Sequence, residues 1–102
     1  LQSKSLCGVT LQYNIEGDGY PVILMHGWGA VDRTTAITSF QGNNLDFPGF
    51  GGSSTPPSIW GVEEYTQMLE AFVKDENIEA PILIGHSFGG RVSILYASRN
   101  KT

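Results

Sequence analysis

The sequence predicts an α/β protein in which a mostly parallel sheet of about four strands is flanked by helices. Residues 21–25 and 81–84 are apolar runs without alternation, as expected of strands that are covered on both faces. An amphipathic helical pattern over residues 63–75 lies between these runs, and a second helical pattern follows over residues 92–97. Strand, helix, strand and helix in this order are typical of a right-handed parallel unit.

The chain begins with a pattern typical of a half-buried strand. Over residues 8–15, one face carries Val9, Leu11, Tyr13 and Ile15, and the other carries Thr10, Gln12 and Asn14. Turn residues at 16–19 separate this strand from the apolar run at 21–25. We therefore expect a hairpin that leads into a central parallel strand.

The helix over residues 63–75 is the clearest element. Its apolar residues recur at the spacing of one helix face, namely Tyr65, Met68, Leu69, Phe72 and Val73. Acidic residues at its start and the Glu70–Lys74 pair favour the same helix. This apolar stripe is expected to pack on the sheet.

A tight turn joins the strand at 81–84 to the last helix. Residues 85–89 read Gly-His-Ser-Phe-Gly, the G-x-S-x-G spacing in which small residues let strand and helix approach closely around a strained serine. This geometry exposes the hydroxyl of Ser87. It also directs the first N–H groups of the following helix toward the place where a negative oxygen would form.

Three segments carry a family resemblance: residues 26–29 (His-Gly-Trp-Gly), residues 45–53 (Leu-Asp-Phe-Pro-Gly-Phe-Gly-Gly-Ser) and residues 85–90. Together they resemble the first part of an α/β-hydrolase, so residues 1–102 are expected to form a single, truncated domain without the C-terminal strands. The resemblance implies that Ser87 is the nucleophile and that the N–H groups of Phe88 and Trp28 form the oxyanion hole. It implies site-shaping roles for His26, Gly27, Gly29, Gly85, His86 and Gly89, with His26 ordering the backbone rather than transferring the proton.

Residues 30–44 depart from the family pattern, which needs a helix and the first half of a strand in this interval. Threonines weaken the helical pattern, and Gln41-Gly42-Asn43-Asn44 is typical of a turn. Only Leu45 and Phe47 are strand-like. We expect a deletion or a sequence error here relative to the family.

A serine nucleophile needs a histidine base and a carboxylate that orients it, and in this fold both follow the serine. The chain after Ser87 contains no Asp, Glu or His. His86 is a poor substitute, since neighbouring side chains on a sharp turn point apart. The sequence thus indicates the N-terminal part of a serine hydrolase for small ester or acyl substrates that is nearly inert alone. The alternative is a non-catalytic module that associates through its exposed sheet edge, with itself or with another chain.

Composition limits the partners. The net charge is −4 and there is no basic cluster, so nucleic acid is not expected. No membrane partner is expected, because no apolar run reaches the roughly 18 residues of a membrane span, and the start of the chain does not have the pattern of a signal peptide. The single Cys7 fits a reducing compartment, and we expect a cytoplasmic protein. No cofactor or metal is expected: Gly49-Phe50-Gly51 lacks the third glycine of a dinucleotide fingerprint, and no phosphate-loop lysine follows.

Overall fold

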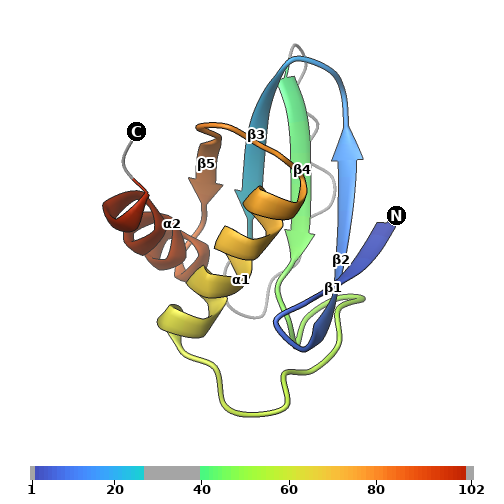
Figure 1. Cartoon of the computed structure of the whole chain (residues 1–102), viewed down its shortest axis with the longest axis vertical. Coiled ribbons are helices and arrows are strands. Elements are labelled where there is room, and N and C mark those ends of the chain that lie inside the picture. The colour runs from blue at the N-terminus through green and yellow to red at the C-terminus, as the bar shows by residue number, and fades with distance from the viewer. Residues whose placement is uncertain (1, 27–39, 101–102) are drawn as a thin grey trace.

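A computed structural model describes residues 2–26 and 40–100 of the chain (Figure 1). The strands are β1 (Gln2–Leu6), β2 (Val9–Glu16), β3 (Tyr20–Met25), β4 (Phe40–Asp46) and β5 (Ile82–Gly85). The helices are α1 (Val62–Asp75) and α2 (Phe88–Arg99). The strands form one sheet in the order β1-β2-β4-β3-β5, and β3, β4 and β5 all point toward the same end of it.

The sheet is mixed, so the prediction of a mostly parallel sheet is only partly matched. β3 is parallel to β4 and to β5, whereas β2 is antiparallel to both β1 and β4. The expected hairpin between β2 and β3 is also wrong, because β4 lies between them. β2 instead forms a hairpin with β1, a polar edge strand without the apolar pattern of a buried strand.

The turn predicted at residues 41–44 is wrong as well, since these residues lie within β4. Backbone pairing on both sides explains the strand: Asn44 is paired with Asn14 of β2 and with Leu24 of β3. Tertiary pairing overrides the weak strand propensity of glycine and asparagine. The strand that the family pattern requires in this interval is therefore present. The helix that the same pattern requires would lie in residues outside the described part.

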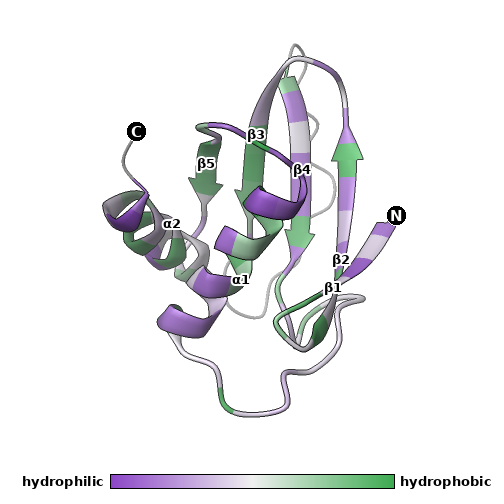
Figure 2. Ribbon diagram, in the orientation of Figure 1, coloured by the Kyte–Doolittle hydropathy of each residue, from purple (hydrophilic) through white to green (hydrophobic). Residues whose placement is uncertain are grey.

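The core lies between the sheet and α1, which crosses one face of it, with α2 flanking β5 (Figure 1). The predicted stripe of α1 is confirmed: Tyr65, Met68, Leu69, Phe72 and Val73 are all buried. Figure 2 shows β3 and β5 as mostly hydrophobic, while β4 is hydrophobic at its start, polar in its middle and hydrophobic again at its carboxyl end. That end supplies Leu45, and Phe47 follows it in the core.

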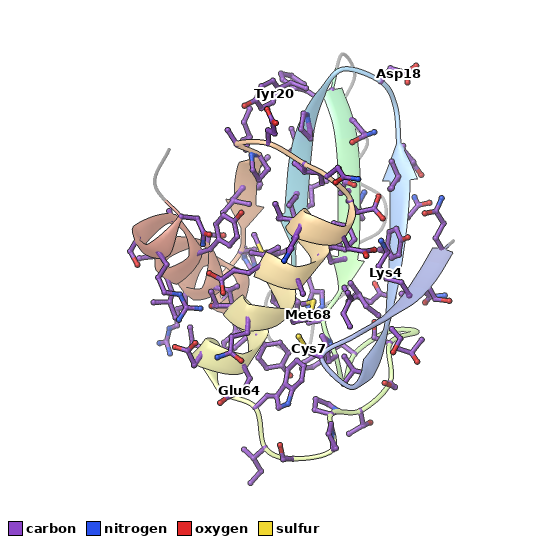
Figure 3. All side chains as sticks on the ribbon, in the orientation of Figure 1. Lys4, Cys7, Asp18, Tyr20, Glu64 and Met68 are labelled. Atoms are coloured by element: carbon purple, nitrogen blue, oxygen red, sulfur yellow. The ribbon has the colours of Figure 1, made fainter. Side chains whose placement is uncertain are left out.

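A cationic side chain ties the N-terminal hairpin to α1. Lys4 of β1 pairs with Asp75 and Glu76 at the carboxyl end of α1, and its ammonium lies 5.4 Å from the ring centroid of Tyr13 (Figure 3). Burial lowers the pKa of Lys4, but hydrogen bonds to the two carboxylates outweigh it and raise the pKa above its usual range. The edge strand β1 is thereby anchored to the helix layer.

Candidate active site

The strand-to-helix turn at Ser87 has the strained geometry that the glycine spacing predicts. β5 ends at Gly85 and α2 begins at Phe88, so only His86 and Ser87 connect them. Ser87 has φ 55° and ψ −111°, a backbone conformation that residues with a side chain seldom adopt. Both connecting residues are exposed, so the serine lies at the surface.

Two glycines allow the close approach of β5, α2 and β3. A Cβ atom on Gly85 would lie 2.3 Å from the carbonyl oxygen of Gly89. A Cβ atom on Gly89 would lie 2.6 Å from the carbonyl oxygen of Met25 and 2.9 Å from that of His26. Any side chain at either position would push the elements apart, because the opposing atoms belong to the backbone.

Backbone hydrogen bonds fix the turn. The N–H of His86 donates to the carbonyl oxygen of Met25 at 3.1 Å, which joins the turn to the carboxyl end of β3. The N–H of Gly90 donates to the carbonyl oxygen of Ser87 at 2.9 Å, closing the first turn of α2. The serine therefore lies beside the point where the chain leaves β3.

Phe88 is the first residue of α2, so its N–H lies in the first turn of the helix. The positive end of the helix dipole also lies there. Its ring packs edge-on against Tyr65 and Phe47, with centroid distances of 5.2 and 6.1 Å. These contacts fix the start of the helix against the core. The other sequence-predicted site residues Gly27, Trp28 and Gly29 lie outside the described residues.

His26 is buried at the end of β3 and contacts the segment that follows β4. Its Nε2 accepts a hydrogen bond from the N–H of Phe47 at 2.9 Å, so this nitrogen carries no proton. The imidazole ring also lies 5.0 and 5.3 Å from the ring centroids of Phe47 and Phe50. At this contact His26 orders a backbone segment, and its Nε2 lone pair is already engaged.

The glycine-rich loop after β4 is held by side chains on its own residues. The carboxylate of the buried Asp46 accepts a hydrogen bond from the N–H of Gly52 at 3.0 Å, which helps to hold the loop. Sequence reasoning missed two further residues. The hydroxyl of Ser53 accepts from the N–H of Gln12 at 2.7 Å, and that of Ser54 accepts from the N–H of Thr10 at 2.8 Å. The sequence signal that could have identified them is the pair Ser53-Ser54 directly after two glycines, because serine side chains in loops often form hydrogen bonds with backbone groups.

The comparisons with known proteins agree with this geometry. The model of the alpha/beta hydrolase fold matches residues 20–102. The chain belongs to the α/β-hydrolase family. It is 35% identical over 88 residues to the Caenorhabditis elegans "Abhydrolase domain-containing protein abhd-5.2", covering 76% of this chain and 20% of the worm protein.

Two solved structures give the same result. The epoxide hydrolase CorEH superposes with a TM-score of 0.87 at 25% identity, and a bacterial membrane phospholipase A with 0.86 at 26%. These matches cover 98% and 97% of this chain, but only 38% and 35% of the larger proteins. The chain thus spans about a third of the length of these structures.

Neither a metal site nor a membrane span is found in the described part of the chain. Across residues 2–26 and 40–100, no three His, Cys, Asp or Glu side chains are grouped so that they could hold a metal ion. Over the same ranges, no helix is long and apolar enough to cross a membrane.

Proposed function

We propose that this chain is the nucleophile-bearing, N-terminal part of a serine hydrolase that cleaves ester or other acyl bonds. The single observation that carries the proposal is the backbone of Ser87, held at φ 55° between β5 and α2. Strain of this kind persists only where the surroundings over-determine it, and here the contacts of Gly85 and Gly89 do so. It displays a serine oxygen at the carboxyl end of parallel strands, where α/β proteins bind ligands.

The start of α2 supports an oxyanion hole. Attack on an acyl carbon places negative charge on oxygen, and an N–H in the first turn of a helix stabilises such charge. Phe88 supplies one such N–H in the proposed site, and we assign the second to Trp28 by analogy with the family. No side chain is needed from either residue for this role.

A base is the component that this chain lacks by itself. His26 uses Nε2 to accept the hydrogen bond from the N–H of Phe47, and no histidine or acid follows Ser87 in the sequence. Loss of base and acid removes on the order of a million-fold in rate, leaving about a thousand-fold over water from binding and the oxyanion hole. We infer that the isolated chain is nearly inert.

The substrate class follows from the nucleophile. A serine oxygen forms an ester with an acyl group that water can then hydrolyse, which suits esters, thioesters and amides. The similarity to a phospholipase A supports an acyl substrate, whereas the similarity to an epoxide hydrolase reflects the shared scaffold. We therefore propose an acyl ester of a small molecule.

The test supplies the missing base and acid. Residues 20–102 would replace the corresponding segment of the phospholipase A that they superpose on, and hydrolysis of a p-nitrophenyl ester would be measured. The expected result is hydrolysis that Ser87→Ala lowers at least about a thousand-fold and that Ser93→Ala, a matched change in α2, leaves intact. A chimera that unfolds cooperatively, yet shows equal activity with Ser87→Ala, would refute the assignment of Ser87.

A further inference from the structure

A buried tyrosine of α1 contacts the residues around the proposed site. Tyr65 lies near the start of the helix and belongs to the core cluster. Its ring centroid lies 5.2 Å from that of Phe88, the first residue of α2, and 5.3 Å from that of Phe47, which follows β4. One side chain of the helix layer thus touches the chain just beyond two of the parallel strands.

The hydroxyl group of Tyr65 adds a directed contact to this packing. It donates a hydrogen bond to the carbonyl oxygen of Pro48 at 2.8 Å, in the same segment as Phe47. Burial raises the pKa of Tyr65, so the hydroxyl keeps its proton and remains a donor at neutral pH. Because a buried carbonyl oxygen is costly to leave without a partner, this hydrogen bond fixes the tyrosine ring against the segment after β4.

Tyr65 is itself held by the start of α1. Its N–H donates to the carbonyl oxygen of Gly61 at 3.2 Å, and the carboxylate of Glu64 accepts a hydrogen bond from the N–H of Gly61 at 2.7 Å. The ring of Trp60 also packs edge-on against the tyrosine ring, with the centroids 5.2 Å apart. A side chain held in this way transmits the position of α1 to the residues that it touches.

The same contacts reach both segments that carry the proposed oxyanion donors. Phe88 carries one of the two N–H groups, and the tyrosine ring touches it directly. Phe47 donates its own N–H to Nε2 of His26 at 2.9 Å, and His26 stands two residues before Trp28, the proposed second donor. Two N–H groups stabilise one oxygen only while their separation is maintained. Tyr65 and its contact with Phe47 therefore connect the end of β3 to the start of α2.

We propose that Tyr65 is a positioning residue for the reaction at Ser87, which acts through Phe88 and the segment after β4 rather than on the substrate. This inference rests on the proposed function, because it gives Tyr65 a part in the reactivity of that serine. The backbone of Ser87 is strained, with φ 55°, and such a conformation persists only where surrounding contacts enforce it. A small displacement of Phe88 would move its N–H away from the developing negative charge and slow the attack.

Phe72 provides the matched control on the same helix. Like Tyr65 it is a buried aromatic residue of the apolar stripe, but its ring packs against Tyr13 of β2, with the centroids 5.2 Å apart. A leucine at either position removes a ring from the core, so both variants are expected to lose stability. The turn at Ser87 distinguishes them, because Tyr65 lies beside Phe88 and Phe72 lies about two turns further along α1.

Native-state hydrogen exchange of the full chain, followed by NMR, measures the order of this turn independently of any reaction. The N–H groups of residues 89–91 donate to carbonyl oxygens of the turn, so their protection reports the start of α2. Relative to the amides of β3, Tyr65→Leu should raise these exchange rates at least about tenfold, and Phe72→Leu should leave them unchanged. Tyr65→Phe keeps the ring and should stay close to the parent. Equal changes in the two leucine variants overturn the proposal.

Fluorophosphonate labelling of the full chain with added imidazole tests the role of Tyr65 in the reaction. The rate of adduct formation at Ser87 should fall at least about tenfold in Tyr65→Leu, stay within about twofold of the parent in Phe72→Leu, and recover in Tyr65→Phe. Phe88→Leu removes the other ring of the contact and should lower the rate to a similar extent, so the test does not depend on one variant.

The two measurements separate this inference from the proposed function. A parent chain that is not labelled at Ser87 refutes the proposed function, and the role of Tyr65 with it. A labelled parent whose rate is unaffected by Tyr65→Leu and Phe88→Leu overturns the role of Tyr65 and leaves Ser87 as the nucleophile.

Discussion

Gly85→Ala is the sharpest test of how the turn at Ser87 is built. The new methyl carbon would lie 2.3 Å from the carbonyl oxygen of Gly89, whereas real Cβ atoms almost never approach closer than 3.0 Å. β5 and α2 must therefore separate by at least about 0.7 Å, because the opposing atoms are backbone and no rotamer change relieves the contact. Overpacking of this kind typically costs about 1–3 kcal/mol, and we expect the upper part of that range.

Gly90→Ala is the matched control, five residues further along. A Cβ atom there would lie 3.6 Å from the carbonyl oxygen of Gly85, an ordinary contact, and alanine favours the helix by about 0.5–1 kcal/mol over glycine. Urea unfolding followed by far-UV circular dichroism measures both free energies of unfolding. Equal stabilities for the two variants would refute the close-approach account of this turn.

Three further predictions concern the surrounding structure. Asn43→Ala should lower the free energy of unfolding by about 1–3 kcal/mol in urea titrations, because Nδ2 of the buried Asn43 donates hydrogen bonds to the carbonyl oxygens of Val22 and Gln41, both at 3.3 Å, and the smaller side chain leaves buried space unfilled; an unchanged value would contradict this. His26→Ala should lower the free energy of unfolding by about 1–3 kcal/mol, because the buried N–H of Phe47 loses its hydrogen-bond acceptor. An unchanged midpoint of urea unfolding would show that this hydrogen bond does not stabilise the fold. A hydrogen bond from Arg99 lowers the pKa of Glu63 below its ordinary value of 4.5. The ion pair therefore stabilises the folded chain above pH 4.5, and this stabilisation is lost as the pH falls through the lowered pKa of Glu63 in the folded state. Acid titration of Glu63→Gln should therefore show a smaller loss of stability than the parent, and parallel curves would argue against the ion pair.

The elements that sequence could predict are those whose local pattern agrees with their environment. The apolar stripe of α1 and the apolar runs of β3 and β5 directly reflect burial. The glycines around Ser87 reflect the close approach of β5, α2 and β3, which only glycine permits. The two strands that sequence reasoning missed, β1 and β4, have no such apolar pattern. β1 is a polar edge strand, and most of β4 is glycine, asparagine and glutamine made extended by pairing on both sides.

The same distinction applies to the site. The strained turn at Ser87 follows from glycine spacing within five residues, so the local sequence pattern predicts it. The loop contacts of Ser53 and Ser54 join residues more than 40 positions apart, and nothing in the local pattern identifies Thr10 or Gln12 as their partners. Likewise, the hydrogen bond between His26 and Phe47 depends on β3 and β4 being adjacent, an order that the sequence pattern did not reveal.

The most direct test of the central claim is the intact mass of the folded chain after exposure to a fluorophosphonate, with and without added imidazole as an external base. The chain has eight other serines that serve as internal controls. We predict little adduct without imidazole, and a single adduct on Ser87 in its presence that is absent from Ser87→Ala. Equal labelling of the parent and Ser87→Ala, or labelling spread over the other serines, would contradict the assignment of Ser87 as the nucleophile.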